Sequence, residues 1–223
     1  VYMFEDKSVL VGMSGGIDST AVCSMLLAQG YRVEGLTLIT CDSGLRAAED
    51  AAALAARLGI PHHIADVRSE FRKLVIEPFI DGYMSGRTPN PCVNCNPTVK
   101  FRLLLEWADK LGCEMIATGH YARLVNLDGR YALSMPEDRC KEQTYMLYRL
   151  PQNMLEKLIL PLSEGTKSEI RTLAGEAGIS AADREDSQEI CFIPDNDHAS
   201  YIEARTGKFP EGDYWLFEED RAV

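Results

Sequence analysis

The sequence predicts an α/β fold, a doubly wound parallel sheet with a small helical appendage. Apolar stretches of strand composition alternate with helical stretches from residue 8 to residue 118, the pattern of a parallel sheet covered on both faces. After residue 150 the sequence reads as helices without intervening strong strands. We therefore expect a first domain over residues 1–150, and a helical appendage with an irregular tail over residues 151–223.

The expected elements are bounded by glycines, prolines and changes of apolar spacing. The predicted strands cover residues 9–12, 32–40, 62–67 and 114–118, and a hairpin covers 124–134. The predicted helices cover residues 20–29, 45–58, 70–84 with Pro78 kinking or splitting it, 100–111, a helix opening in 142–150, and then 152–158, 167–177 and 199–205. Residues 86–97 are expected to form a loop that is fixed by three prolines.

Residues 14–19, Ser-Gly-Gly-Ile-Asp-Ser, lie between the first predicted strand and the first predicted helix. Glycines let the backbone approach an anion, and the following helix N-terminus offers free N–H groups. Ser14 and Ser19 add hydroxyl donors, whereas Asp18 would repel a phosphate unless a cation lay between them. The stretch therefore indicates a nucleotide with Mg²⁺, although an ordinary glycine turn is the simpler alternative.

Two commoner nucleotide motifs do not fit residues 14–19. A Walker loop needs a lysine followed by serine or threonine, and a dinucleotide fingerprint needs a third glycine. The stretch resembles instead the PP-loop of ATP pyrophosphatases, which cleave ATP between the α and β phosphates and adenylate a substrate. This resemblance makes residues 1–150 a PP-loop ATP-binding catalytic domain, with ATP and Mg²⁺ as its ligands.

Composition limits the partners that we expect. The 223 residues are 46% hydrophobic and 26% charged, which is typical of a globular domain, and no apolar run approaches the roughly 18 residues of a membrane span, so we expect no membrane partner. The net charge of −11 opposes broad nucleic-acid binding, so such a partner would need a local basic patch or a further domain. Seven cysteines without a secretory signal favour the cytoplasm and functional thiols.

Three cysteines are candidates for chemistry. Cys92 and Cys95 form a single C-x-x-C pair, too little by itself to indicate zinc, and Cys191 is a third candidate thiol. A chance pair in a rigid loop and a buried apolar cysteine are the alternatives. The remaining cysteines and two adjacent histidines have structural interpretations, with Cys41 a weak candidate near the nucleotide: Cys23, Cys41, Cys113, Cys140, His62 and His63.

Five stretches together resemble the tRNA 2-thiouridylase family, which places sulfur on the wobble uridine of tRNA. They are Gly-Met-Ser-Gly-Gly-Ile-Asp-Ser at 12–19, Gly-Arg-Thr-Pro-Asn-Pro through Cys-Asn at 86–96 with Lys-Phe at 100–101, Ala-Thr-Gly-His-Tyr-Ala-Arg at 117–123, Lys-Glu-Gln through Leu-Tyr-Arg-Leu at 141–150, and Asp-Ser-Gln-Glu-Ile-Cys-Phe-Ile at 186–193. They occur in the family's order, and together they are far more specific than the first stretch alone.

The resemblance implies a reaction in which ATP adenylates the oxygen at uridine position 2 and a persulfide sulfur then attacks that carbon. The family's persulfide carrier matches Cys191, and its partner cysteine matches Cys95. Because thiolates are the reactive form, both cysteines are expected to have lowered pKa values. The implied partners are tRNA and a sulfur-donor protein or sulfide.

The family's binding residues carry over to matching positions. The ATP contacts are Gly12, Met13, Ser14, Gly15, Gly16, Ile17, Asp18, Ser19, Leu38 and Gly119. The tRNA-facing residues are Asn90, Pro91, Cys92, His120, Lys141, Glu142 and Gln143, although His120 could be a turn residue instead.

The chain departs from the family pattern in three ways. Cys92 occupies a position where the family usually has aspartate, and Leu38 one where it usually has methionine. The family also continues into two β-rich domains that help hold tRNA, so we expect a truncated form or a short variant. Cysteine at residue 92 suggests a second mechanism, in which Cys92, Cys95 and Cys191 hold a four-iron four-sulfur cluster with one open iron for hydrosulfide.

Two other function classes remain open from the residues. One is a PP-loop enzyme of the amidotransferase type, and the other is a non-catalytic zinc or scaffold module. Of these three function classes, only sulfur transfer requires that residues 90–96 and residues 186–191 both face the space above residues 14–19.

Overall fold

The computed structural model describes residues 7–176, 190–193, 196–209 and 215–222. The chain divides into two compact units, Val1–Ser187 and Gln188–Val223. The phosphate-loop candidate and the Cys92–Cys95 pair belong to the first unit, and Cys191 belongs to the second. Among the described helices, none combines the length and the apolar character that crossing a bilayer requires.

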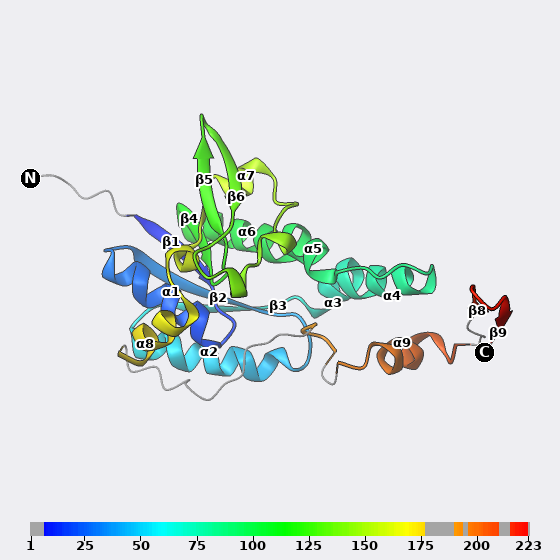
Figure 1. The fold of residues 1–223 in the computed structure, drawn as a ribbon. Coiled ribbons are helices and arrows are strands. Elements are labelled where there is room, and N and C mark those ends of the chain that lie inside the picture. The colour runs from blue at the N-terminus through cyan, green and yellow to red at the C-terminus, as the bar shows by residue number, and fades with distance from the viewer. Residues whose placement is uncertain (1–6, 177–189, 194–195, 210–214, 223) are drawn as a thin grey trace, which may run out of the picture. The chain divides into compact units, whose positions relative to one another are not determined.

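A five-stranded parallel sheet forms the centre of the first unit (Figure 1). Its strands are β1 (Ser8–Gly12), β2 (Arg32–Ile39), β3 (His62–Asp66), β4 (Met115–Thr118) and β7 (Leu158–Ile159). They pair in the order β3-β2-β1-β4-β7, and every pair is parallel. The winding direction therefore reverses between β1 and β4, and ligands of such sheets bind at this reversal, beyond the carboxyl ends of the strands.

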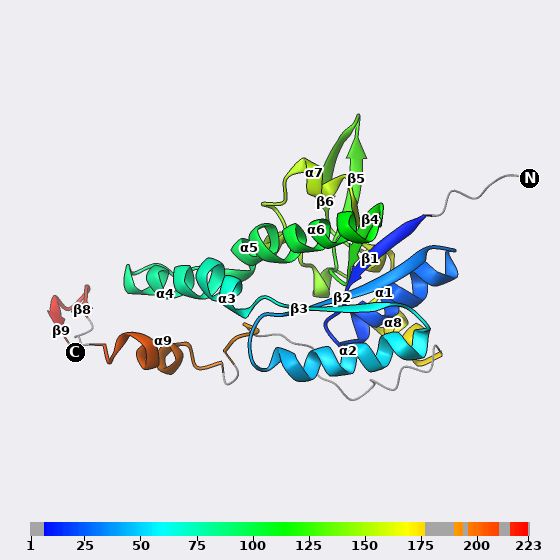
Figure 2. The ribbon, with the colours of Figure 1, turned by 180° about the vertical axis from the view of Figure 1, so that it is seen from behind.

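Helices cover both faces of the sheet, as predicted (Figures 1 and 2). One face carries α1 (Ile17–Ala28), α2 (Gly44–Leu58) and α8 (Lys167–Glu176), and the other carries α6 (Phe101–Leu111) and α7 (Gln152–Leu155). Strand β1 supplies both cores, because successive side chains of a strand point to opposite faces. Val9 and Val11 belong to the core with α1, and Leu10 to the core with α6; all three are fully buried.

The remaining elements of the first unit are short. They are α3 (Arg68–Phe71), the π-helical η1 (Arg72–Ile76), α4 (Glu77–Met84), α5 (Pro91–Cys95), the π-helical η2 (Asn96–Lys100), the antiparallel hairpin of β5 (Arg123–Leu127) and β6 (Arg130–Ser134), and the 3-10 turns η3 (Arg139–Lys141), η4 (Thr144–Met146) and η5 (Pro161–Glu164). Pro78 directly follows the π-helical turn η1, so it cannot donate to the Leu74 carbonyl, and that carbonyl accepts from Asn94 Nδ2 at 2.7 Å instead. The helical stretch predicted over 70–84 therefore continues past Pro78.

The first compact unit extends beyond the predicted domain boundary at residue 150. Strand β7 adds to the sheet beside β4, with Ile116 opposite Leu158 and Ala117 opposite Ile159. Helix α8 packs on α1, and its Ile170 is buried in the same core. A two-residue strand is too short for a periodic sequence signal, so residues 151–176 read as purely helical although the sheet includes them.

Two local predictions differ from the structure. Residues 86–97 are not a loop throughout, because Asn90 caps α5, accepting at Oδ1 from the Cys92 N–H at 3.0 Å, and Pro91 takes the first helical position. Residues 142–150 contain only the turn η4 (Thr144–Met146). The Gln143 N–H donates to the Tyr121 carbonyl at 2.9 Å, which draws that backbone away from a helix.

The second unit contains α9 (His198–Thr206) and the antiparallel pair β8 (Trp215–Leu216) and β9 (Arg221–Ala222). Asp197 caps α9 by accepting at Oδ1 from the Ser200 N–H at 3.0 Å. The ring of Phe192 lies 5.5 Å from that of Tyr201, between ring centroids. Helix α9 thus packs against the segment that carries Cys191.

Candidate active site

The phosphate-loop candidate joins β1 to α1 at the predicted place. The Ser14 N–H donates to Ser19 Oγ at 3.2 Å, and Ser19 Oγ donates to the Gly16 carbonyl at 3.2 Å. Gly16, the N-cap of α1, provides no side-chain cap. The loop is therefore closed by its own serines, while the N–H groups of the first helical turn lack a side-chain acceptor at the cap.

Two glycines allow protein segments to pack closely around the loop. Gly15 has a φ of +73°, and a Cβ there would lie 2.6 Å from the Ala47 carbonyl of α2. Gly119 follows β4, where a Cβ would lie 3.1 Å from both Asp18 Cβ and the Ser19 nitrogen. A side chain at Gly15 would displace the loop, and one at Gly119 would crowd the first turn of α1.

Asp18 already has a cationic partner within the protein. Lys167 Nζ lies 2.7 Å from both Asp18 carboxylate oxygens, and the Tyr121 hydroxyl donates to Asp18 Oδ1 at 3.1 Å. The Lys167 and Asp18 side chains are 10% and 29% exposed. Lys167 therefore balances the negative charge of Asp18, which the sequence alone led us to assign to a metal ion. The Asp18 carboxylate is partly exposed, so a metal ion can also reach it.

The loop lies at the reversal point of the sheet, which is where the fold predicts a ligand. Gly12, at the end of β1, stands opposite Thr118, at the end of β4. Leu38 lies on the neighbouring strand β2 and packs partly buried against the core beside α6. Met13 is buried, and its carbonyl accepts from Thr37 Oγ1 at 2.9 Å. These residues bring the predicted ATP positions together at one edge of the sheet.

His120 directly follows Gly119 and is buried rather than an exposed turn residue. Its Nδ1 lies 2.8 Å from Thr118 Oγ1, and its Nε2 lies 3.5 Å from Lys100 Nζ. Burial and then the positive charge of Lys100 hold the pKa of His120 well below its usual value. The ring is therefore neutral at pH 7, a state in which Nε2 can accept a hydrogen bond from Lys100.

The thiol of Cys95 does not have the lowered pKa that we expected. Burial raises the pKa of Cys95 and outweighs the nearby Lys100 ammonium, which lowers it; Cys92 adds a smaller upward effect. The physical reason is the cost of placing a thiolate in a mostly buried position. Cys95 is thus less ionised at pH 7 than a free cysteine, although the neighbouring Lys100 ammonium favours its thiolate form.

The predicted tRNA-facing residues fall into two groups in the first unit. Asn90 and Pro91 line a small cavity of about 280 Å³ beside α4 and α5. Gln143 is tied to Tyr121, whose N–H donates to Gln143 Oε1 at 3.0 Å. Partial burial and then Cys92 and Glu142 raise the pKa of Tyr145. Lys141 closes the turn η3 by donating its N–H to the Asp138 carbonyl at 3.2 Å.

The other cysteines and the paired histidines have structural surroundings. Burial raises the pKa of Cys23 to about 12, so this thiol is inert at pH 7. Cys113 is buried, and Cys140 is exposed. His62 Nε2 lies 2.9 Å from Thr37 Oγ1, and His63 Nε2 lies 2.8 Å from Glu34 Oε2. Cys41 is half-buried, with its Sγ 3.1 Å from Ser43 Oγ.

Cys191 belongs to the second unit, where it is exposed beside the buried Phe192 and Ile193. The interpretation as a buried apolar cysteine is therefore wrong. Of the stretch 186–193, residues 186–189 lie outside the described residues. Within the described part of the chain, no group of three or more histidine, cysteine, aspartate or glutamate side chains is arranged to hold a metal. A cluster shared by Cys92, Cys95 and Cys191 remains a prediction.

Sequence reasoning missed three charged or polar residues of this site: Lys167, Lys100 and Tyr121. A capping pattern does mark the start of α8, because the Thr166 N–H donates to Glu169 Oε2 at 2.8 Å. That pattern predicts where the helix begins, but not that Lys167 reaches Asp18 across 149 positions of sequence. Lys100 and Tyr121 lie within the quoted family stretches, yet their contacts appear only in three dimensions.

Two solved structures share this fold. The NMN synthetase of Francisella tularensis matches with a TM-score of 0.53 and 17% identity, over 93% of this chain and 80% of that one. The glutamine-dependent NAD⁺ synthetase of Acinetobacter baumannii, solved with ADP, matches with a TM-score of 0.50 and 17% identity, over 77% of this chain and 29% of that one. At this identity the likeness establishes the α/β fold alone.

Relatives known by sequence are much more similar. The tRNA-specific 2-thiouridylase MnmA 3 of Phocaeicola vulgatus is 47% identical over 90% of this chain and 56% of its own length. The corresponding protein of Bacteroides fragilis is 50% identical over 84% and 51%, and MnmA of Syntrophotalea carbinolica is 46% identical over 91% and 59%. The chain thus spans a little over half the length of these relatives. The family model described as "tRNA methyl transferase HUP domain" matches residues 7–195, and the chain therefore belongs to this family, that of the tRNA-specific 2-thiouridylases.

Proposed function

We propose that this chain carries the ATP-dependent catalytic part of an enzyme that transfers sulfur to the wobble uridine of tRNA, forming 2-thiouridine. The observation that supports this most is a series of contacts from the phosphate loop to a thiol. Gly119 packs against Asp18, the adjacent His120 lies 3.5 Å from Lys100, and Lys100 acts electrostatically on Cys95. A phosphate loop fits any adenylating enzyme, whereas a thiol connected to that loop through His120 and Lys100 favours sulfur transfer.

The phosphate loop fits ATP on its donor set. Gly15 and Gly119 let α2 and the end of β4 pack closely against the loop, the first turn of α1 offers N–H groups, and Ser14 adds a hydroxyl. Adenylation of the uridine oxygen makes AMP the leaving group, and Mg²⁺ would balance the phosphate charge beside Asp18. The proposed ATP-binding residues are Gly12, Met13, Ser14, Gly15, Gly16, Ile17, Asp18, Ser19, Leu38 and Gly119.

The uridine would lie between this loop and the Cys95 region. His120 is neutral and buried, so it can contact a base without adding charge. Asn90 and Pro91 fix the start of α5, and Gln143 is held by Tyr121. The proposed tRNA-facing residues are Asn90, Pro91, Cys92, His120, Lys141, Glu142 and Gln143.

For the sulfur, we propose that exposed Cys191 carries a persulfide and that Cys95 is its partner in the first unit. The outer persulfide sulfur attacks C2 of the uridine, and the adenylated oxygen leaves as part of AMP. The Cys95 thiolate then attacks Cys191 Sγ, which breaks the bond to the transferred sulfur and leaves a Cys95–Cys191 disulfide for an external thiol to reduce. The alternative is a four-iron four-sulfur cluster on Cys92, Cys95 and Cys191, which would supply hydrosulfide on its open iron; three thiols suit such a cluster. Iron and sulfide analysis after anaerobic purification separates the two routes.

The decisive experiment for the function is thiolation of an unmodified tRNA transcript by this chain with ATP, Mg²⁺ and a sulfur source. One reaction receives a protein persulfide, which can charge Cys191 by sulfur exchange, and the other receives sulfide, which suits only the cluster route. We expect 2-thiouridine and AMP in equal amounts, with weak and strongly salt-dependent tRNA binding because the chain spans only part of its relatives. The family description names methyl transfer instead, so a parallel reaction receives a methyl donor in place of ATP and sulfide. Methylated uridine without thiouridine would overturn the proposal.

Two further outcomes test the other function classes. If AMP release stays coupled to product formation in both Cys95→Ala and Cys191→Ala, the enzyme is of the amidotransferase type. One bound zinc and no AMP release would indicate a binding module. The cytoplasmic location that cysteine content predicts stays a prediction.

A further inference from the structure

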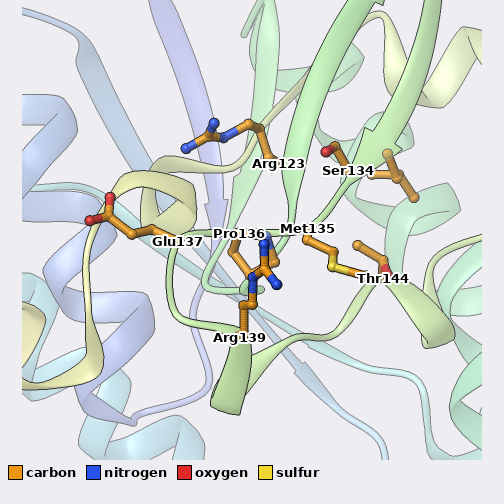
Figure 3. Close-up of a pocket in the computed structure, with 8 residues that line it drawn as sticks. Arg123, Ser134, Met135, Pro136, Glu137, Arg139 and Thr144 are labelled. Atoms are coloured by element: carbon orange, nitrogen blue, oxygen red, sulfur yellow. The ribbon is translucent and has the colours of Figure 1, made fainter.

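A second cavity of the first unit, apart from the phosphate loop, has unusual charges. It measures about 770 Å³ and lies between the β5–β6 hairpin and the segment that follows it. Its lining includes Arg123 from the start of β5, and Glu137 and Arg139 from the segment after β6, which Figure 3 draws as sticks. The volume is in the range of small-ligand sites, which is roughly 300–1,000 Å³. None of these three residues is among those to which the family resemblance assigns a role.

The two arginines of this cavity lack partners within the described part of the chain. Neither Arg123 nor Arg139 forms an ion pair or side-chain hydrogen bond with any residue that the structure describes. The Nε atom of Arg123 is moreover buried without an acceptor among those residues. Leaving a buried donor unpaired is costly, so such a group calls for an explanation. A ligand with acceptor oxygens explains it.

The cavity is connected to the proposed active site by short hydrogen bonds. The Asp138 carboxylate, between Glu137 and Arg139, accepts from the Lys167 backbone N–H at 3.0 Å, and Lys167 holds Asp18. Thr144, on another wall, follows Gln143, which is bonded to Tyr121. Arg123 itself comes three residues after His120. A polymer whose reactive unit lay at the phosphate loop would therefore reach this cavity with a neighbouring unit.

We infer that this cavity binds a backbone phosphate of the RNA strand next to the target nucleotide. The inference rests on the proposed function, since it takes tRNA as the substrate. A guanidinium offers a planar pair of donors that matches a phosphate, and such contacts position a nucleic acid without reading its sequence. The net charge of the chain is −11, so two arginines in one cavity without a partner among the described residues form a local exception to an acidic protein.

Glu137 gives the cavity a carboxylate as well, and this predicts effects of opposite sign. The Glu137 side chain, like those of the arginines, has no ion pair or hydrogen bond with a described residue. Its charge would repel a phosphate held by the arginines, although less strongly than a direct contact attracts it. Removing the negative charge should therefore tighten RNA binding, whereas removing either positive charge should weaken it.

The test measures binding of a short RNA stem-loop to the full chain at several salt concentrations. Arg123→Gln and Arg139→Gln should each weaken binding about tenfold at low salt and make the slope of log K against log salt shallower by roughly 0.7. Glu137→Gln should tighten binding by about twofold. Arg130→Gln is the matched control, because Arg130 is an exposed arginine at the turn end of the same hairpin and outside the cavity.

Unchanged affinity and slope in both arginine variants, or an equal loss in Arg130→Gln, would overturn the inference. Arg139 is exposed, so its substitution keeps the test valid even if Arg123→Gln disturbs the hairpin. Thiolation by the unsubstituted chain, measured in parallel, separates the two proposals. If the unsubstituted chain thiolates tRNA but the arginine variants bind RNA as it does, the phosphate site in the cavity is refuted and the proposed function stands. If the unsubstituted chain neither binds RNA nor thiolates it, both proposals are refuted.

Discussion

Two lysines of the first unit lie beside proposed reactive groups, and their surroundings differ. Lys167 is paired with both oxygens of Asp18 at 2.7 Å at the phosphate loop. Lys100 lies 3.5 Å from neutral His120 and has no ion pair with a carboxylate in the described residues. The positive charge at the loop is thus balanced inside the protein, whereas the charge at the thiol acts on Cys95 and His120 unopposed.

This difference separates what substitutions should do in the two regions. The phosphate loop is held in shape by glycine geometry and a compensated ion pair, so changes there should appear in nucleotide handling and stability. The region around Cys95 depends on an uncompensated charge and on burial, so changes there should appear in titration and thiol reactivity.

The largest effect is expected from Gly15→Ala. The substitution adds a Cβ 2.6 Å from the Ala47 carbonyl at a φ of +73°, so the loop must move. We expect AMP formation to fall by more than about tenfold and the free energy of unfolding to fall by about 2 kcal/mol or more. Gly129→Ala is the control, with a φ of +85° and no atom within 4 Å of the added Cβ. Equal losses of stability in the two variants would show that α2 does not constrain the loop.

The next largest effect is expected from breaking the balanced pair. Lys167→Met leaves the Asp18 carboxylate facing the phosphates without its cation, and we expect AMP formation to fall about tenfold or more. Asp18→Asn and Ser14→Ala should also reduce it about tenfold, since each removes a phosphate-loop contact. Lys157→Met is the matched control, because Lys157 pairs with Asp109 at 3.1 Å on the surface.

The double variant Asp18→Asn with Lys167→Met sharpens this comparison. If the pair acts as a unit, the double variant should lose less than the product of the two single losses. AMP formation that stays unchanged in Asp18→Asn and Ser14→Ala would refute the phosphate site itself.

The sequence predicted the parts of this site that depend on local chain geometry. Strand, glycine turn and helix follow one another at residues 8–28 as expected, because buried β1 and the helix spacing of α1 are both visible in apolar pattern. The parallel sheet followed from the alternation of strands and helices, whereas the strand order and its reversal beside β1 come from the structure. Gly119 was placed at the loop by resemblance, and the structure packs it on Asp18.

What the sequence could not predict depends on contacts between distant segments. Lys167 meets Asp18 only because α8 packs on α1, and β7 joins the sheet with too few residues to show a period. The pKa of Cys95 was expected to fall because a cation is near, but the opposing burial is a property of the packed structure. Asn90 followed by Pro91 was a readable helix-start signal that was taken for a loop.

A smaller effect is expected from removing the unopposed charge. Lys100 lowers the pKa of Cys95, so Lys100→Met should raise that pKa further and leave less thiolate at a given pH. We expect alkylation of Cys95 at pH 8 to slow by about threefold or more, which corresponds to about half a pKa unit. Peptide mapping follows each thiol separately, with exposed Cys140 as the internal reference. Lys110→Met, on the outer side of α6, should leave the rate unchanged, and an equal slowing there would remove Lys100 from the account.

The smallest expected effect is a pH dependence of stability that His120 causes. The folded protein holds His120 neutral well below its usual pKa of 6.5, while the unfolded chain binds a proton there. Stability should therefore fall as the pH drops below 6.5, by at most about 1.4 kcal/mol per pH unit from this group. His120→Gln keeps hydrogen-bonding atoms near Thr118 and Lys100 but cannot titrate, so its stability should fall less steeply between pH 6.5 and pH 5.

His62 also has a lowered pKa and contributes to the pH dependence of stability in both proteins, as do the carboxylates. Only the difference between the two stability curves therefore reports on His120. Parallel curves for His120→Gln and the unsubstituted chain would mean that the folded protein protonates His120 as readily as the unfolded chain, and that the site beside Lys100 holds two positive charges below pH 6.5.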